Sequence, residues 1–233
     1  MRRKMIIQEN AARTLILWMI WAAVAVAVHV AMYIDLDLWE YVQQDQSRVT
    51  WITYGLFLLG VLLSFGLMIR VIIESIRAKK LGYLARDHGL IDLAIEHPSQ
   101  AVERFFLSLK ELAVKNDEPD VEALLDIELA PYRRLSHAID VFGNILITLG
   151  LIGTVVGLIT ILAGLTTSMN ALGHDQEKLL GGIRHAMGGM GTSFYATLLG
   201  SVLGGLLLRV FVWINEHGIE ELAENLKKIS MVY

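Results

Sequence analysis

Four long runs of uncharged, mostly apolar residues constrain this chain more than any other feature. They cover residues 14–34, 51–69, 141–165 and 193–214, and the last is broken only by Arg209 near its end. A helix needs about 20 apolar residues to cross the hydrocarbon core of a bilayer, so each run is long enough for one crossing. Charged residues make up only 19% of the chain, against about 25% in soluble domains. The sequence therefore predicts an all-α membrane protein with four transmembrane helices.

The placement of Lys and Arg predicts the orientation of these helices. The segment before the first run, the segment between the second and third, and the end from Arg209 hold 4, 10 and 3 of the 20 basic residues. The loops 35–50 and 166–192 hold the other three. Because cytoplasmic segments carry the excess of Lys and Arg, we expect the tails 1–13 and 215–233 to be cytoplasmic and both loops to be external.

The segment 70–140 is then a cytoplasmic insert, and its pattern is helical. Apolar residues recur at helical spacing on both sides of a break at His97-Pro98, with Ser99 as a candidate N-cap. A polar turn at 116–120 forms a second break. From Tyr132 onward the pattern is expected to continue without interruption into the third run. The tail 215–233 is expected to extend the fourth helix into the cytoplasm.

Several classes of function are disfavoured by what the chain lacks. It has no cysteine, and its seven histidines are scattered, so we expect no disulfide and no metal site. We also expect no cofactor and no enzymatic activity. No basic run suggests nucleic acid. No Asp, Glu, Lys or Arg lies in the apolar centre of any run, although a proton pathway normally needs a titratable group at that depth. If this chain conducts protons, another subunit should supply the carboxylate. His29 is more simply a buried or interfacial histidine than a proton relay.

The third and fourth runs differ from the first two in their small residues. Glycines on one face of the third run and small or hydroxyl residues on one face of the fourth let membrane helices approach closely. The pattern by itself favours a helix-packing surface over a polar pore. The glycines expected at helix contacts are Gly150, Gly153, Gly157, Gly200 and Gly204, and the hydroxyl residues beside them include Thr154 and Thr197.

The stretch 149–159, with the sequence LGLIGTVVGLI, resembles the third-span signature of the MotA/TolQ/ExbB family of ion-driven motor subunits. The stretch 182–200 resembles the approach to the last span of that family. The resemblance covers about residues 132–208, and the first two runs and the insert match only in layout. Two positions depart from the TolQ/ExbB pattern: Thr192 stands where a Glu is common, and Gly205-Leu206 stands where Ile-Pro is common.

The resemblance implies a bacterial inner-membrane subunit that forms a ring, usually a pentamer, around two helices of a partner. The partner is a MotB-, TolR- or ExbD-like protein with one span and one transmembrane Asp. Ring threonines face that Asp, and they match Thr154 and Thr197 here. The implied function is an ion-driven motor or stator that converts proton- or sodium-motive force into mechanical work.

Two other functions, and one question within the family, stay open at this point. The chain could instead be a non-conducting scaffold that assembles an envelope complex through its small faces. A solute carrier is the third possibility, and it is disfavoured because no run shows the broken-helix pattern of many transporter sites. Within the family, four spans match the MotA layout, whereas the third-span signature is closer to TolQ and ExbB. The branch of the family is therefore open, and the ion and the driven load are not specified.

Overall fold

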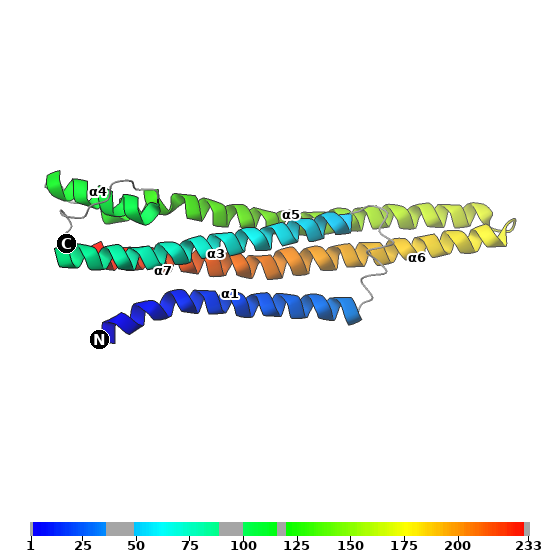
Figure 1. The fold of residues 1–233 in the computed structure, drawn as a ribbon. Helices are drawn as coiled ribbons and strands as arrows, with labels where there is room; N and C mark the ends of the chain where they lie inside the picture. Colours follow the sequence, from blue (N-terminus) through cyan, green and yellow to red (C-terminus); the bar gives the residue numbers. More distant parts are fainter. Residues whose placement is uncertain (1, 36–48, 89–99, 116–119, 231–233) are drawn as a thin grey trace. The chain divides into compact units, whose positions relative to one another are not determined.

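The computed structural model describes residues 2–35, 49–88, 100–115 and 120–230, and those residues are helical apart from short turns (Figure 1). No strand occurs among them. Three of the helices follow one another without an intervening loop, because α6 passes into a π-helix, η1, and then into α7. The elements are α1 (Arg2–Asp35), α3 (Val49–His88), α4 (Ala101–Lys115), α5 (Val121–Ala171), α6 (Gln176–Leu199), η1 (Gly200–Leu208) and α7 (Arg209–Ser230).

Among the described residues, four helices are long and apolar enough to cross a membrane, which agrees with the four predicted spans. They are longer than the apolar runs: α3 has 40 residues and α5 has 51. A bilayer needs only about 20 residues, so both helices extend far outside the hydrocarbon core. Pro131 lies inside α5 and does not end it. The span and the insert segment beside it are therefore one continuous helix.

The predicted loop 166–192 is largely helical, which corrects its expected extent. Helix α5 continues to Ala171 and α6 begins at Gln176, so only a tight turn joins them, at the end of the hairpin in Figure 1. Gly173 takes a φ of +80° in this turn, a conformation that favours glycine. Asp175 then caps α6 by accepting from the Lys178 backbone N–H at 3.1 Å. Most of the loop 35–50, Ser99 and the polar turn 116–119 lie outside the described residues.

The chain divides into two compact units, each built from parts of several long helices. The first unit comprises Met1–Ile20, Leu63–Ala138 and Phe211–Tyr233, and the second comprises Trp21–Leu62 and Ile139–Val210. In the first unit the indole of Trp18 packs between two aromatic rings from α3 and α7. Its ring centroid lies 4.9 Å from that of Phe65 and 5.1 Å from that of Phe211.

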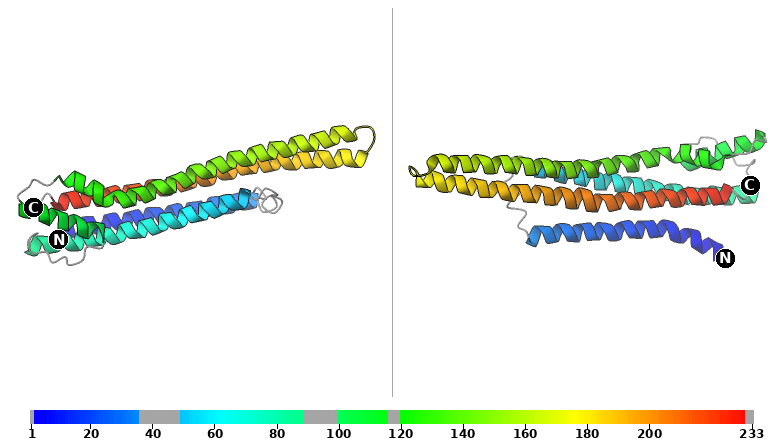
Figure 2. Two further views of the ribbon diagram at one scale, coloured as in Figure 1. Left: turned by 90° about the horizontal axis from the view of Figure 1, so that it is seen from above. Right: turned by 180° about the vertical axis from the view of Figure 1, so that it is seen from behind.

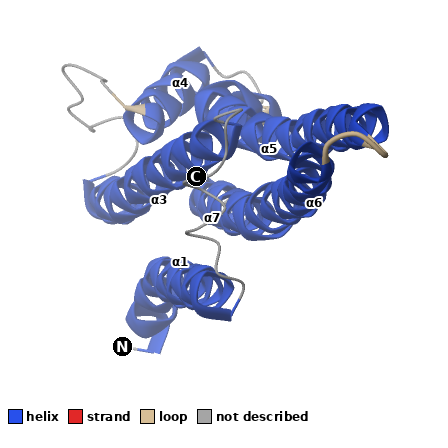
Figure 3. Ribbon diagram, turned by 90° about the vertical axis from the view of Figure 1, so that its right-hand side faces the viewer, coloured by secondary structure: helices blue, strands red, loops and turns tan. Residues whose placement is uncertain are grey.

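Helix α4 packs beside α3 and α5 in the first unit (Figure 3). Val102, Phe105 and Phe106 are almost fully buried, as their helical spacing predicted. Glu74 of α3 fixes the start of α4. Its buried carboxylate accepts hydrogen bonds from the backbone N–H groups of Ala101, at 3.1 Å, and Val102, at 3.4 Å. A carboxylate at a helix N-terminus satisfies unpaired N–H groups and interacts favourably with the helix dipole.

The same carboxylate ties α5 to this junction, because Tyr132 Oη donates to Glu74 Oε1 at 2.8 Å. One acidic side chain therefore connects three helices. No pattern along the chain predicted this role, since Glu74 lies 27 residues before the first residue of the helix that it caps. A second contact, the ion pair between Arg104 and Glu128 at 2.7 Å, holds α4 against α5.

We predict that Glu74→Ala loosens α4 while the four spans stay folded. The substitution leaves two backbone N–H groups and one hydroxyl without their acceptor, and each unsatisfied buried group costs about 1–3 kcal/mol. Hydrogen–deuterium exchange of residues 101–115 in the purified full chain should become faster. Glu111→Ala, on the exposed face of the same helix, is the control. Equal exchange in both variants would show that Glu74 does not hold α4.

Candidate functional site

The second unit contains a hairpin of α5 and α6 whose backbones approach very closely (Figure 2). Glycines make this approach possible. A Cβ atom added to Gly150 would lie 2.9 Å from the Ala196 carbonyl oxygen, and one added to Gly157 would lie 2.6 Å from that of Gly189. Real Cβ atoms are essentially never within 3.0 Å of another heavy atom. No residue except glycine fits at these points without moving a backbone.

The other glycines predicted at helix contacts lie along the same contact of α5 with α6 and η1, which we call the glycine seam. A Cβ atom on Gly153 would collide with Ala196, and one on Gly200 would lie 2.7 Å from the Leu146 carbonyl oxygen. Gly204 faces the backbone of Gly143. The structure thus places all five of these glycines along the contact of α5 with α6 and η1, inside one chain.

This approach brings Thr154 and Thr197 together. Their Oγ1 atoms are hydrogen-bonded to each other, one from α5 and one from α6. Thr154 Oγ1 also lies 3.1 Å from the Gly150 carbonyl oxygen, and Thr197 Oγ1 lies 3.2 Å from that of Ser193. Both side chains are half-buried. The two threonines singled out in the sequence therefore form one site within the subunit.

Ser193 is a third hydroxyl at this site that was not predicted to take part in it. It is 5% exposed, and its Oγ donates to the Thr154 carbonyl oxygen at 3.1 Å or to that of Gly189 at 3.1 Å. Its own carbonyl oxygen lies 3.4 Å from Thr154 Oγ1 and 3.2 Å from Thr197 Oγ1, so it can accept from the hydroxyl that does not donate within the pair. Ser193 and Thr197 are four residues apart and so lie on one face of the helix. This spacing is the sequence feature that could have predicted that Ser193 takes part in the site.

Comparison with known proteins shows one family. A family model described as the MotA/TolQ/ExbB proton channel family matches residues 99–228, more than half of the chain. The chain belongs to this family. No curated protein and no solved structure matches it. The match includes the whole of the α5–α6 hairpin and the threonine pair, so the site lies in the part of the chain that the family defines.

The hydroxyl pair has spare hydrogen-bonding capacity that suits a proton channel family. Each threonine hydroxyl has one proton to donate and can accept at two lone pairs. Because the two Oγ1 atoms share one hydrogen bond, one hydroxyl must donate elsewhere, either to a backbone carbonyl or to an incoming group. The pair can therefore donate to a carboxylate, accept from a protonated carboxylic acid, or coordinate a cation through oxygen.

No ionisable side chain of α5 lies between Asp140 and His174. In α6 and η1 no Asp, Glu, Lys, Arg or His lies between His185 and Arg209. Thr192, at the position where TolQ and ExbB commonly have Glu, donates to the Gly188 carbonyl oxygen of its own helix at 3.0 Å. The hydroxyl pair thus has no carboxylate from these segments of its own chain.

His29 stands apart from this site. Its ring packs edge-on against Tyr54 of α3, with centroids 5.2 Å apart, and lies 6.4 Å from the ring of Tyr33. These aromatic contacts agree with the simpler interpretation of His29 as a packed histidine. They do not connect it to the threonine pair.

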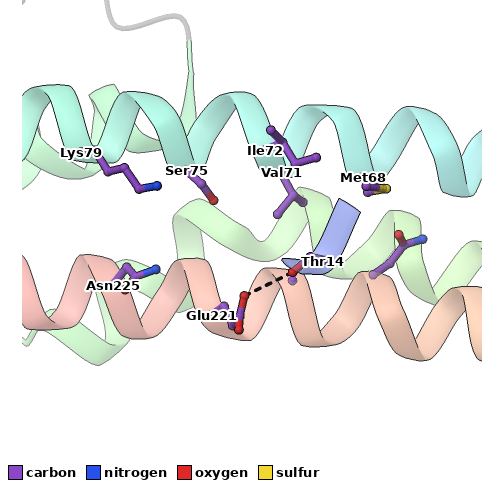
Figure 4. Close-up of a pocket in the computed structure, with 10 residues that line it drawn as sticks. Thr14, Met68, Val71, Ile72, Ser75, Lys79, Glu221 and Asn225 are labelled. Atoms are coloured by element: carbon purple, nitrogen blue, oxygen red, sulfur yellow. Dashed lines mark hydrogen bonds between the residues drawn. The ribbon is translucent and has the colours of Figure 1, made fainter. Parts of the chain in front are cut away.

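A small cavity in the first unit is lined by polar and apolar side chains (Figure 4), and one of its lining residues, Asn215, belongs to a buried hydrogen-bond cluster. Asn215 donates to Ser64 Oγ at 2.8 Å, and Trp18 donates to the same oxygen at 3.1 Å. The Asn215 Oδ1 atom has no partner among the described residues. Asn215 lines the cavity of about 20 Å³, which has room for one water molecule.

We predict that Gly157→Ala destabilises the subunit, although alanine is the better helix former. The added methyl group would meet the Gly189 carbonyl oxygen, and overpacking of a tight contact typically costs about 1–3 kcal/mol. The matched control is Gly188→Ala, because nothing lies within 4 Å of a Cβ atom there. Thermal unfolding of the purified protein should show a lower midpoint for Gly157→Ala only. Equal midpoints would mean that the seam is not tight.

Proposed function

We propose that this chain is the ring subunit of an ion-driven motor or energy-transducing complex. Several copies, five by analogy with the family, surround two single-span helices of a MotB-, TolR- or ExbD-like partner that carries one transmembrane Asp. The ring conducts protons or sodium ions together with that Asp and couples their flux to rotation. The complex resides in a bacterial inner membrane, with both termini and the insert in the cytoplasm.

The observation that carries this proposal is the threonine pair, which lies where the stretches 141–171 of α5 and 186–208 of α6 and η1 contain no charged residue. An ion beside the pair has no charged partner from these stretches, and the transfer of an unpaired ion into a low-dielectric interior is costly. A carboxylate from a partner helix removes this penalty, and Thr154 and Thr197 offer it hydrogen bonds. Protonation or cation binding at that carboxylate is then the transport step.

The exposed surface of the hairpin supports assembly into a ring. Large apolar side chains of α5 and α6 are more than half exposed on the single chain, including Ile159, Leu162 and Phe194. A surface of this kind is covered by lipid or by another protein. Neighbouring copies and lipid together would cover it.

A non-conducting scaffold is the alternative function. It uses the same glycine seam, but it gives the hydroxyl groups no role beyond packing. The two functions differ in what they expect when a threonine is replaced by a smaller residue that lacks the hydroxyl. Substitutions at Thr154 and Thr197 therefore separate them.

We predict that Thr154→Ala and Thr197→Ala each reduce ion flux through the reconstituted complex by about tenfold or more. A hydrogen bond to a charged group contributes about 1.5–3 kcal/mol, and each variant removes one such donor. Thr154→Ser and Thr197→Ser keep the hydroxyl and should retain most of the flux. Flux should be followed in liposomes under a proton gradient and, separately, under a sodium gradient.

Thr160→Ala is the matched control, because Thr160 is also half-buried on α5 and its hydroxyl donates to the Val156 carbonyl oxygen of its own helix at 3.0 Å. It should conduct like the wild type. If Thr154→Ala and Thr197→Ala assemble normally and also conduct like the wild type under both gradients, the pair has no part in the ion route.

A further inference from the structure

The glycine seam contains the same side-chain arrangement twice, once from each helix. In each case the Oγ atom of a buried serine packs against a glycine of the opposite helix. Ser193 of α6 lies against Gly157 of α5, and Ser168 of α5 lies against Gly182 of α6. A Cβ atom added to either glycine would collide with the serine Oγ atom. The hairpin therefore holds two serine–glycine contacts that run in opposite directions.

The two serines are also matched in burial and in hydrogen bonding. Ser193 is 5% exposed and Ser168 is 6% exposed. The Ser193 Oγ atom lies 3.1 Å from a carbonyl oxygen of its own helix and 3.1 Å from one across the seam. The corresponding distances for Ser168 are 3.0 Å and 3.1 Å. Packing by itself therefore gives the two serines equal importance.

The two contacts differ in what surrounds them. Ser193 lies one helical turn from Thr197, and the carbonyl oxygen that it reaches across the seam is that of Thr154. For Ser168 the oxygen across the seam is that of Leu179. Ser168 is 14 residues from Thr154 in the sequence, or about 21 Å along α5. Ser168 thus makes the same kind of contact far from the threonine pair.

Ser193 acts on the hydroxyl pair through two of its atoms. Its Oγ atom bonds to the backbone that carries the Thr154 side chain, and Thr197 follows one turn later on α6, so this bond fixes how the two hydroxyls meet. One hydroxyl of the pair must donate outside it, because the two share a single hydrogen bond. The Ser193 carbonyl oxygen lies near both Oγ1 atoms. It can therefore accept that proton whichever threonine carries it.

We propose that Ser193 is a positioning residue for the ion step at the threonine pair. This inference rests on the proposed function. The serine side chain holds the two hydroxyls in register, and its carbonyl oxygen accepts the proton that is not shared within the pair. When an ionised carboxylate of the partner reaches the pair, that hydroxyl rotates and donates to it. When the carboxylate has bound a proton or a cation, the hydroxyl returns to Ser193, so no buried donor is left unpaired.

The test compares Ser193→Ala with Ser168→Ala in liposomes that contain the complete complex with its Asp-bearing partner. Each change removes one Oγ atom and adds none, so neither crowds the opposite glycine. Both should lower the thermal midpoint of the complex by a similar amount. Only Ser193→Ala should lower the ion flux, by about two- to tenfold, as expected for the loss of one hydrogen bond between neutral groups. Flux in Ser193→Ala that equals or exceeds the flux in Ser168→Ala would overturn the inference.

A double substitution separates positioning from stability. Positioning acts through the Thr154 hydroxyl, so Ser193→Ala should lower the flux little further in a complex that already carries Thr154→Ala. A purely structural serine predicts that the two losses multiply, and that result also overturns the inference. If Ser193→Ala does not assemble, as judged by native mass spectrometry, Ser193→Cys decides, with Ser168→Cys as its control. A thiol is a weaker donor than a hydroxyl, so lower flux in Ser193→Cys than in its control supports the inference and equal flux overturns it.

These outcomes are distinct from failure of the proposed function. A wild-type complex that conducts neither ion contradicts the ion-channel role itself. If the wild type conducts and Thr154→Ala lowers the flux, while Ser193→Ala conducts like Ser168→Ala, the channel role stands and only the positioning role of Ser193 is removed.

Discussion

The close approach of α5 and α6 is the constraint on which the site depends. Two membrane helices can touch backbone to backbone only where side chains are absent, and glycines occur along both sides of this seam, as at Gly157 and Gly189. Without that proximity, short side chains such as Thr154 and Thr197 could not hydrogen-bond to each other. Small-residue packing, which the pattern alone favoured over a pore, is therefore what builds the polar site. A packing surface and a hydroxyl pair therefore lie along one helix contact.

In the first unit, helix contacts are fixed by buried polar side chains. Glu74 joins α3, α4 and α5 through three hydrogen bonds, while Ser64 accepts from Trp18 and Asn215. At Ser64, which lies in the apolar run 51–69, apolar packing specifies the helix register weakly, because lipid is as apolar as leucine. Directional hydrogen bonds supply that specificity, since a slipped register would leave buried groups unsatisfied.

The sequence was informative wherever a pattern repeats along one helix. Apolar run length predicted the four spans, and glycine spacing placed Gly150, Gly153 and Gly157 on one face. It was uninformative about contacts between residues far apart in the chain, such as the capping of α4 by Glu74 and the reach of Arg209 to Asp140. The sequence also predicted too short an α5–α6 hairpin, because the polar and glycine-rich residues between 166 and 192 are typical of a loop. Pairing of the two helices keeps them regular there.

The central claim is that the ring supplies hydroxyl groups and its partner supplies the ion-binding carboxylate. Flux in liposomes should be compared for the subunit alone, for the complex, and for the complex whose partner carries Asn in place of its transmembrane Asp. The account predicts flux only in the complex with the intact Asp. Substantial flux through the subunit alone, or through the complex with the Asn-bearing partner, would contradict it.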